Sequence, residues 1–452
     1  MNEILRRKFL GRSTRRVFAL GAAALAAPRP SRAAANEKVR MAAIGVGGRC
    51  FGLVRGFVSR GDVDMVTLCD VYPQRDRLLA ASKLVADKQG KAPSFVQDYR
   101  RVLDDKSIDA VIVGTPDHWH GPMSIFACQA EKDVYVEKPP SHNVWEGRKM
   151  VEAARRYKRV VQVGTQNRSA VYAHKALEFI ESGALGTIHL CKVYNMKQGS
   201  PYQLKPNGEP RAGMDYDTWL GPVQSRPYND GICYRGGWHK FWDFSGGDIA
   251  DDGIHQLDLA RYLVGKGVPK AVHATGGNLA FQDDREVPDV QMVSYQYDDL
   301  VMTLEASHYT SGYMRKTGGS IRQGNTFPYW YQNATRIELY GTKNLLVLGR
   351  HGGGWQAFTA EGKVVDECYG YHPDPDHKEN FIQCIRSRQR PNSDVEIGHK
   401  STVLVHLANI AYRVGHRRLE FDAKSEQFGD DAEANRLLKR DYREKFRVPE
   451  IV

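Results

Sequence analysis

The sequence predicts an α/β protein in two parts, a doubly wound parallel sheet followed by an α+β domain whose strands are mostly antiparallel. Two observations predict this order. Short apolar runs that end in glycine or an acidic residue alternate with helical segments up to about residue 166, which is typical of strand–helix–strand units. Beyond that point apolar residues recur at every second position, as in half-buried antiparallel strands.

Composition excludes several classes of protein. The 452 residues are 41 % hydrophobic and 26 % charged, which is ordinary for a globular chain of two or three domains. The formal net charge is +11, but the first 35 residues account for +7 of it. The remaining +4 on a large folded part gives no reason to expect nucleic-acid binding. Seven cysteines without a Cys-x-x-Cys pair do not indicate a disulfide framework.

The first 35 residues have the features of an export signal. Val17–Ala27 is an apolar run of eleven residues, too short to cross a bilayer and suited to a signal-peptide core. Ala33–Ala35 supplies small residues for cleavage, and Arg15-Arg16 before the apolar run resembles the twin-arginine signal. We therefore expect residues 1–35 to be a twin-arginine signal peptide. The mature protein would then be periplasmic or extracytoplasmic, without a membrane span.

Strands and helices alternate in the expected first domain, residues 36–166. The expected strands are Val39–Gly45, Val63–Asp70, Asp109–Gly114, Asp133–Glu137 and Val160–Gly164, and the expected helices are Gly48–Ser59, Gln74–Ala86, Met123–Ala130 and Val144–Tyr157. Because such sheets bind ligands at the carboxyl ends of their strands, we look for functional residues directly after each apolar run.

The turn after the first strand predicts dinucleotide binding. Gly45 and Gly47 form a G-x-G that would bring the backbone close to a pyrophosphate at a helix N-terminus. The usual third glycine is replaced by Cys50, so the match is incomplete. Asp70 ends the next strand, where a carboxylate accepts hydrogen bonds from the ribose of NAD and repels the 2′-phosphate of NADP. These features predict a Rossmann domain that prefers NAD.

Three further stretches carry a family resemblance. Gly114–His120 (GTPDHWH) and Glu137–Pro140 (EKPP) each follow a predicted strand, and Gly246–Asp258 contains a D-x-G-x-H pattern. Together with the glycine turn they resemble the Gfo/Idh/MocA oxidoreductases, which include glucose–fructose oxidoreductase and inositol dehydrogenase. The resemblance extends from about Lys38 to the end of the chain.

The resemblance implies the partners and the contacts of the site. It implies that residues 167–452 form a substrate and oligomerisation domain around a large open sheet, in a dimer or tetramer that acts on a small sugar or glycoside. The implied cofactor contacts are Gly45, Gly47, Gly48, Arg49, Asp70, Thr115, Pro116, His120, Glu137 and Lys138.

The expected catalytic residues are Lys138, Asp251 and His255. Lys138, desolvated beside a cationic cofactor ring, is expected to have a lowered pKa and to polarise the substrate oxygen. Asp251 and His255 are four residues apart, so we expect them on one helical face. His255 is the candidate general base, and Asp251 would orient the substrate or pair with the lysine. Asp252 and Asp258 are expected to lie outside the site.

No metal site is expected. His118 and His120 stand two residues apart in what the proline predicts to be a loop, and no third ligand follows. The stretch from His372 to His377 is interpreted as a turn before a helix.

The second half is expected to hold six strands, two helices and two aromatic-rich regions. The strands are Ile188–Asn195, Ala271–Thr275, Gln291–Tyr297, Met302–His308, Thr335–Tyr340 and Asn344–Leu348, and the helices are His377–Arg386 and Gly398–Val414. Aromatic residues in Tyr216–Phe244 and Tyr309–Tyr331 suit either sugar stacking or packing. Lys424–Val452 is highly charged and is expected to be an exposed arm.

The leading hypothesis is an exported NAD-dependent oxidoreductase that acts on a carbinol of a sugar, sugar derivative or cyclitol by hydride transfer. Because free NAD is scarce outside the cytoplasm, the cofactor is expected to be tightly retained. One alternative is an NAD-dependent glycosidase or epimerase that oxidises its substrate transiently. The other is a non-catalytic sugar-binding protein on the same scaffold.

Overall fold

A computed structural model describes residues 37–234, 236–310, 312–315 and 321–452. Residues 1–35, for which we predict an export signal, lie outside the described residues. Within the described residues, six parallel strands form a sheet in the order β3-β2-β1-β4-β5-β6. The strands are β1 Val39–Ile44, β2 Val63–Cys69, β3 Ser94–Val96, β4 Ala110–Val113, β5 Asp133–Val136 and β6 Val161–Val163. This confirms the predicted doubly wound parallel sheet.

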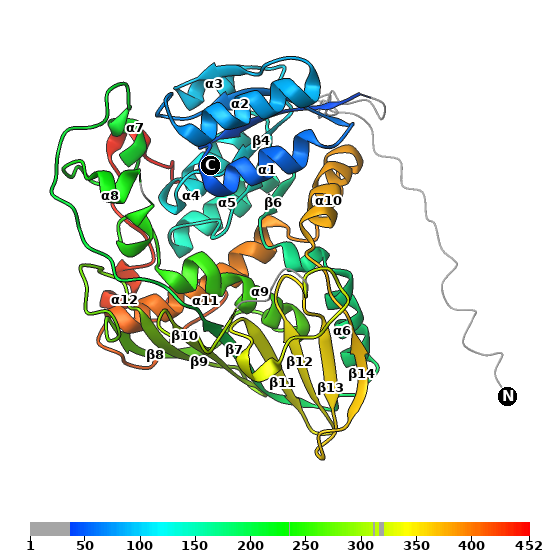
Figure 1. Ribbon diagram of the computed structural model, residues 1–452. Helices are drawn as coiled ribbons and strands as arrows, with labels where there is room; N and C mark the ends of the chain where they lie inside the picture. Colours follow the sequence, from blue (N-terminus) through cyan, green and yellow to red (C-terminus); the bar gives the residue numbers. More distant parts are fainter. Residues whose placement is uncertain (1–36, 235, 311, 316–320) are drawn as a thin grey trace, which may run out of the picture. The chain divides into compact units, whose positions relative to one another are not determined.

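Helices cover this first sheet (Figure 1). They are α1 Gly48–Val58, α2 Asp76–Gln89, α3 Tyr99–Asp104, α4 Asp117–Gln129 and α5 Val144–Arg156. Strand β3 and helix α3 were not predicted, because neither is long enough to show a period. Helix α4 begins at Asp117 rather than at the predicted Met123, so the stretch predicted to be a loop forms the first turn of a helix. Pro116 precedes that turn in an extended conformation and does not interrupt it.

A second, nine-stranded sheet dominates the rest of the described chain, in the order β14-β13-β12-β11-β7-β10-β9-β8-β15. Its strands are β7 Ile188–Met196, β8 Ala271–Gly277, β9 Val290–Gln296, β10 Val301–Ser307, β11 Arg336–Gly341, β12 Leu345–Gly349, β13 Trp355–Phe358, β14 Val364–Cys368 and β15 Leu419–Glu420. Among them only β7 and β10 pair in parallel, so the expectation of a mostly antiparallel sheet is confirmed. The last three strands of the chain, β13 to β15, were missed.

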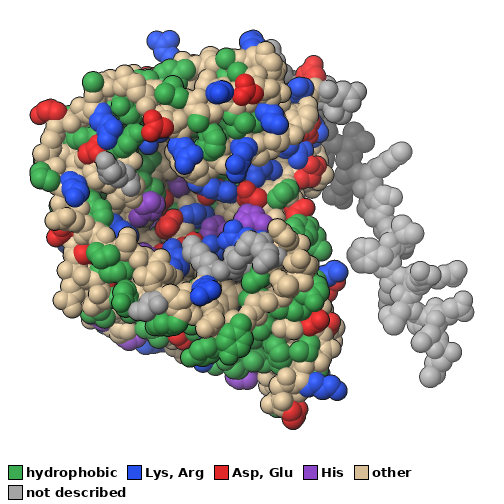
Figure 2. Space-filling model, in the orientation of Figure 1, with side chains coloured by type: hydrophobic (Ala, Val, Ile, Leu, Met, Phe, Trp, Pro, Cys, Tyr) green, Lys and Arg blue, Asp and Glu red, His purple; other side chains and the backbone are tan. Residues whose placement is uncertain are grey.

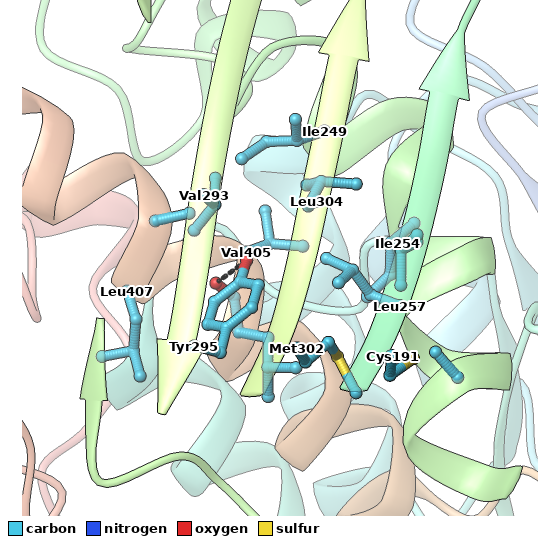
Figure 3. Packing of buried hydrophobic residues seen from close by; sticks show 14 of the residues in the cluster. Cys191, Ile249, Ile254, Leu257, Val293, Tyr295, Met302, Leu304, Val405 and Leu407 are labelled. Atoms are coloured by element: carbon cyan, nitrogen blue, oxygen red, sulfur yellow. Dashed lines mark hydrogen bonds between the residues drawn. The ribbon is translucent and has the colours of Figure 1, made fainter. Parts of the chain in front are cut away.

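One face of the second sheet packs on helices. Helices α6 Val171–Glu181, α9 Ile254–Leu263 and α11 Val395–Arg413 lie along it (Figure 1). Figure 3 shows Met302 and Leu304 on one strand, Tyr295 on the next, and Leu257 and Val405 on the helices that pack behind these strands. The hydroxyl of Tyr295 donates to the carbonyl of Leu404 at 3.0 Å, so this large buried ring also satisfies its polar atom.

Helix α11 joins the two domains, because it contacts α5 and β6 of the first and β8 of the second. Helix α10, Asp374–Ser387, packs on the first domain through Phe381, whose ring lies 6.2 Å from that of Phe57 and 5.6 Å from that of Tyr135. Both predicted helices are therefore present and lie at the domain junction. No helix among the described residues is long and apolar enough to cross a membrane.

The aromatic-rich segment 216–244 is mostly a packed cluster. It contains the short helices α7 Tyr216–Leu220 and α8 Asp230–Cys233, whose apolar side chains pack together with Tyr72 of the first domain. Of the two interpretations that the sequence allowed for this segment, packing accounts for Trp219, Tyr228 and Phe244, which are at most 4 % exposed.

The expectation of an exposed C-terminal arm is wrong. Phe446, Val448 and Val452 are at most 4 % exposed and belong to the core of the first domain. The ring of Phe446 lies edge-on to Trp119 at a centroid distance of 5.5 Å. Charged residues dominate the composition of this arm, but the few apolar side chains between them are enough for it to pack on the first domain. Phe446, Val448 and Val452 thus complete the core of the first domain.

Replacing Phe446 by alanine should lower the free energy of unfolding of the first domain by about 3–5 kcal/mol, because it leaves a cavity under Trp119. The matched control is Ile451→Ala in the same arm, where the side chain is 82 % exposed. It should change stability by less than about 0.5 kcal/mol. Urea titration followed by tryptophan fluorescence measures both, and equal effects would show that the arm does not dock.

Candidate functional site

A cavity of about 440 Å³ opens at the carboxyl ends of the parallel strands. Every cofactor contact implied by the sequence lines it, namely Gly45, Gly47, Gly48, Arg49, Asp70, Thr115, Pro116, His120, Glu137 and Lys138. Figure 2 shows a hollow in the middle of the face in view, in which histidine, basic and acidic side chains gather. The first domain and the segment from Thr218 to Asp251 both contribute to the wall of the cavity.

The glycine turn has the geometry that a pyrophosphate requires. Gly45 has a φ of +78°, and a Cβ there would come within 2.7 Å of Thr115, so only glycine fits. A Cβ at Gly47 or Gly48 would meet nothing within 4 Å, so the backbone at the start of α1 is open to the cavity. Gly47 has no side chain with which to cap α1, which leaves the first N–H groups of the helix for an anion.

Cys50 fits in place of the third fingerprint glycine. Its side chain packs against Gly114, where an added Cβ would stand 2.6 Å from the Cβ of Cys50. The close approach between α1 and β4 is therefore preserved, with the glycine on the strand side rather than on the helix. The Sγ is fully buried, and this raises the pKa of the thiol. Cys50 is thus a packing residue, and the open turn before it is unaffected.

Asp70 lies at the end of β2, as predicted, and is 4 % exposed. Its Oδ1 accepts hydrogen bonds from the backbone N–H of Tyr72 at 3.0 Å and from Nε of Arg75 at 3.1 Å. Burial raises the pKa of this carboxyl, against the opposing charge of Arg75. The sequence analysis missed Arg75, which also lines the cavity. A carboxylate and a guanidinium therefore stand together where the fold places the adenosine ribose.

Arg49 links the glycine turn to two other parts of the chain. Its Nε donates to Glu137 at 2.8 Å, and its Nη2 donates to Asp374 at 2.8 Å. Asp374 begins α10, so this guanidinium fastens that helix to the cavity wall. The two carboxylates raise the pKa of Arg49 despite its burial. Glu137 is thereby fixed directly before Lys138.

Lys138 and Asp251 form an ion pair that joins the domains. The Nζ of Lys138 donates to Oδ1 of Asp251 at 2.7 Å and to the Asp251 carbonyl at 2.5 Å. The prediction of a lowered lysine pKa is wrong. Burial alone would lower it, but the carboxylates of Asp251 and Glu137 raise it, and Lys138 correspondingly lowers the pKa of Asp251 well below its usual range. The pair is charged at neutral pH.

Asp251 and His255 do not share one regular helix. Asp251 lies in a π-helical turn, Ile249–Gly253, and α9 begins after it at Ile254. The wider turn aims Asp251 and Asp252 at different partners. Asp252 pairs with Arg350 at 2.8 Å and with Lys197 at 3.4 Å. Asp258 is fully buried against Arg168 at 2.9 Å, so both carboxylates that we expected outside the site have structural partners.

His255 is buried behind the pair and does not line the cavity. It is 5 % exposed, and its ring lies 4.5 Å from that of His351. Its Nδ1 has no hydrogen-bond partner among the described residues. Burial, together with the charges of Arg350 and Lys138, lowers its pKa well below the usual range. At neutral pH it is therefore an uncharged imidazole and a weaker base than the sequence predicts.

The two histidines of α4 hold the site together. The two ring nitrogens of His120 lie 2.7 Å from the carbonyl of Pro139 and 2.8 Å from that of Thr115, and the neutral ring donates to one of them, so it stands between the lysine segment and the end of β4. His118 bonds the carbonyl of Trp219 at 2.9 Å, and burial lowers its pKa to about 3. No group of three metal-ligating side chains occurs in the described part of the chain.

Sequence reasoning missed two cavity residues beside the ion pair. Asp117 stands in the GTPDHWH stretch, but only its neighbours were given roles. His239 lies 3.9 Å from Asp251, measured from Nε2 to Oδ1, and its ring stacks on Trp238 at 3.6 Å. No motif surrounds His239, so only its position in space reveals it.

Comparisons with known proteins agree with this geometry. A family model described as "Oxidoreductase family, NAD-binding Rossmann fold" (Gfo/Idh/MocA) matches residues 39–165. The model of its "C-terminal alpha/beta domain" matches residues 191–327 and 320–448.

Individual relatives match over part of their length. The scyllo-inositol 2-dehydrogenase (NAD(+)) of Bacillus subtilis is 26 % identical over 61 % of this chain and 64 % of its own. A glycosyl hydrolase family 109 protein of Stenotrophomonas maltophilia is 40 % identical over 126 residues, which are 26 % of this chain and 27 % of its own. The chain therefore spans less than two thirds of the length of these curated relatives.

A solved structure shares the fold. The WlbA dehydrogenase of Bordetella pertussis, in complex with NADH and UDP-GlcNAcA, matches with a TM-score of 0.61 and 20 % identity, over 85 % of this chain and 99 % of its own.

Proposed function

We propose that this chain, which belongs to the Gfo/Idh/MocA oxidoreductase family, catalyses hydride transfer between NAD and a carbinol of a sugar, sugar derivative or cyclitol. The observation that carries the proposal is the Lys138–Asp251 pair, 2.7 Å apart in the wall of the dinucleotide cavity. The named activity of the scyllo-inositol dehydrogenase supports this substrate class.

The cavity residues fit NAD, which supplies the hydride acceptor when bound. The open backbone at Gly47 and Gly48 takes the pyrophosphate, and Asp70 takes the ribose hydroxyls of the adenosine half. These contacts leave the far half of the cofactor for the ends of β4 and β5, where Lys138 stands.

Residues of the chain itself polarise the carbinol oxygen and position the group that does so. Lys138 is an ammonium that donates to the carbinol oxygen and stabilises the negative charge that develops there. Asp251 aims that ammonium. His255, the general base that the motif predicts, does not line the cavity, and its lowered pKa makes it a weak base. Raising the pKa of a buried lysine in this way suits an electrophile rather than a base.

A second candidate is an internal redox cycle, as in a glycosidase that oxidises its substrate transiently and then returns the hydride. The local identity of 40 % with a glycosyl hydrolase family 109 protein favours it. Both candidates use the same lysine. The third hypothesis is a non-catalytic sugar-binding protein, in which Lys138 has no catalytic role.

Lys138→Met should lower the rate of hydride transfer by about 10²–10⁴-fold and leave NAD bound, because it removes the cation that meets the carbinol oxygen. Absorbance at 340 nm after addition of a panel of inositols, aldoses and glucosides measures the transfer. Lys83→Met, at an exposed position of α2, is the control. Equal rates in the two variants would remove Lys138 from the mechanism. If no sugar in the panel reduces NAD⁺ in the unchanged protein, the hypothesis of a non-catalytic sugar-binding protein is favoured.

Asp70→Ser should weaken NAD⁺ binding and strengthen NADP⁺ binding, each by about tenfold (about 1.4 kcal/mol), because it removes the acceptor of the ribose bonds and frees Arg75 for a phosphate. Isothermal titration with both nucleotides measures the two affinities. Equal affinities of the unchanged protein for NAD⁺ and NADP⁺ would contradict the role of Asp70.

Residues 1–35 support export by the twin-arginine route, which carries folded proteins and would let a bound cofactor travel with the chain. The full chain expressed in a bacterium should therefore reach the periplasm with one NAD or NADH per chain in native mass spectra. An Arg15→Lys, Arg16→Lys variant should stay in the cytoplasm with the same adduct. Export of that variant would contradict the route, and exported protein without the adduct would contradict cofactor retention.

A further inference from the structure

Asp117 is a buried carboxyl in the cavity wall for which the mechanism above has no use. It opens α4, is 3 % exposed, and accepts one hydrogen bond, from the hydroxyl of Ser245 to Oδ2 at 2.6 Å. It forms no ion pair with any residue that the structure describes. A buried carboxyl with so little support is costly to ionise, so something else must compensate its charge.

Charged groups reach Asp117 from two other segments. Lys138 follows β5 and favours the ionised carboxyl, whereas Glu137 beside it and Asp251 in the π-helical turn disfavour it. Lys138 is already held by Asp251 at 2.7 Å, so its charge is not free for Asp117. Burial is the largest effect and raises the pKa of Asp117 to about 8. The group is protonated at neutral pH in the protein without cofactor.

The strand order would direct the reactive half of a bound dinucleotide toward this carboxyl. Asp70 follows β2, the glycine turn follows β1, and Asp117 and Lys138 follow β4 and β5, in that order across the sheet. A dinucleotide held at the first two positions extends toward the last two. The ring that accepts hydride is a cation when oxidised and neutral when reduced. The positive charge of the oxidised ring would therefore compensate an ionised Asp117, and this charge disappears when the ring is reduced.

We propose that Asp117 exchanges a proton as the cofactor changes its charge, so that the oxidised form binds to an ionised Asp117 and the reduced form to a protonated one. This inference rests on the proposed function, because it assigns the proton that the oxidation of a carbinol releases. The carbinol's C–H bond breaks and its hydrogen passes with both electrons to the cofactor ring. Its O–H bond breaks, a C=O bond forms, and the proton ends on the Asp117 carboxylate.

Such a site would store the proton together with the hydride. The protein with bound cofactor then neither takes up nor releases a proton when it oxidises one substrate. The proton and the hydride both remain in the site for the reverse reaction. A retained cofactor that is reoxidised in place needs this arrangement more than an exchangeable one, because the reverse reaction consumes the same proton.

Several other cavity groups have pKa values shifted away from this range. Burial lowers the pKa values of His120 and His239 and keeps both rings neutral above pH 7. Burial raises the pKa values of the thiols, that of Cys233 to about 12. The Lys138 pKa is raised, so the ammonium persists throughout. Burial also raises the pKa of Asp70, but this carboxyl would meet the ribose that both forms of the cofactor share. A pH dependence between pH 6.5 and 8 that only the oxidised form shows therefore reports on Asp117.

Isothermal titration of the nucleotide-free full chain with NAD⁺ and with NADH, from pH 6.5 to 9, tests the proposal. NAD⁺ must expel a proton to bind below pH 8, so its Kd should rise up to about tenfold for each pH unit below that value. The Kd of NADH should stay constant within about twofold. Parallel pH profiles for the two nucleotides would overturn the proposal.

Two variants locate the effect. Asp117→Asn keeps an acceptor for Ser245 and cannot ionise, so its two profiles should be parallel, and a persisting pH-dependent difference would overturn the assignment. Ser245→Ala removes the bond that favours the ionised carboxyl, so the midpoint of the NAD⁺ profile should move to higher pH. If Asp117→Asn does not fold, an unmoved midpoint in Ser245→Ala overturns the proposal by itself.

The control is Asp87→Asn, which removes an exposed carboxylate of the same domain and should leave both profiles unchanged. The titrations use no substrate. Failure of the proposed function appears as absent absorbance change at 340 nm with every sugar, whereas failure of this inference appears as parallel binding profiles.

Discussion

The ion pair between Lys138 and Asp251 is the constraint on which the rest of the site depends. It joins the end of a parallel strand in the first domain to a π-helical turn in the second, at 2.7 Å. The surrounding contacts position its two residues. His120 fixes the lysine segment, Arg49 fixes the glutamate before it, and the wide turn separates Asp251 from Asp252. The lysine side chain is 16 % exposed and the aspartate side chain 36 %, so either charge alone would lose its partner at a partly desolvated position, and the site exists only while the domains stay together.

The sequence predicts most of the fold because its strands carry a strong local signal. Each predicted strand is present with ends that differ by two residues or fewer. The strands that were missed are very short or, like β14, mostly exposed, so no apolar period marks them. The C-terminal arm was misjudged for the opposite reason. Its charges dominate its composition, while three apolar anchors decide where it lies. The local sequence pattern thus predicts strands well, but it does not predict where the C-terminal arm packs.

The same limit applies to the site. Motifs predicted which residues surround the cavity, but not their charge states. Lys138 was expected to lose basicity through burial, and the carboxylate that reverses this effect stands 113 residues away in the chain. Cys50 departs from the glycine fingerprint, and Gly114 on the facing strand compensates for it. Asp117 lay inside a recognised motif and was passed over, because only its burial, its single hydrogen bond and its lack of a cation give it chemical interest.

Segments from the second half of the chain complete the first domain. Asp374 at the start of α10 holds Arg49 at 2.8 Å, Arg440 and Tyr442 of the terminal arm hold the fully buried Glu146, and Phe446 packs under Trp119. Strand order alone suggests a dinucleotide domain that could fold as soon as β6 is made. These contacts argue instead that its cavity takes its final form only when the whole chain is in place. A cofactor that needs the finished cavity would therefore bind only after both domains have folded.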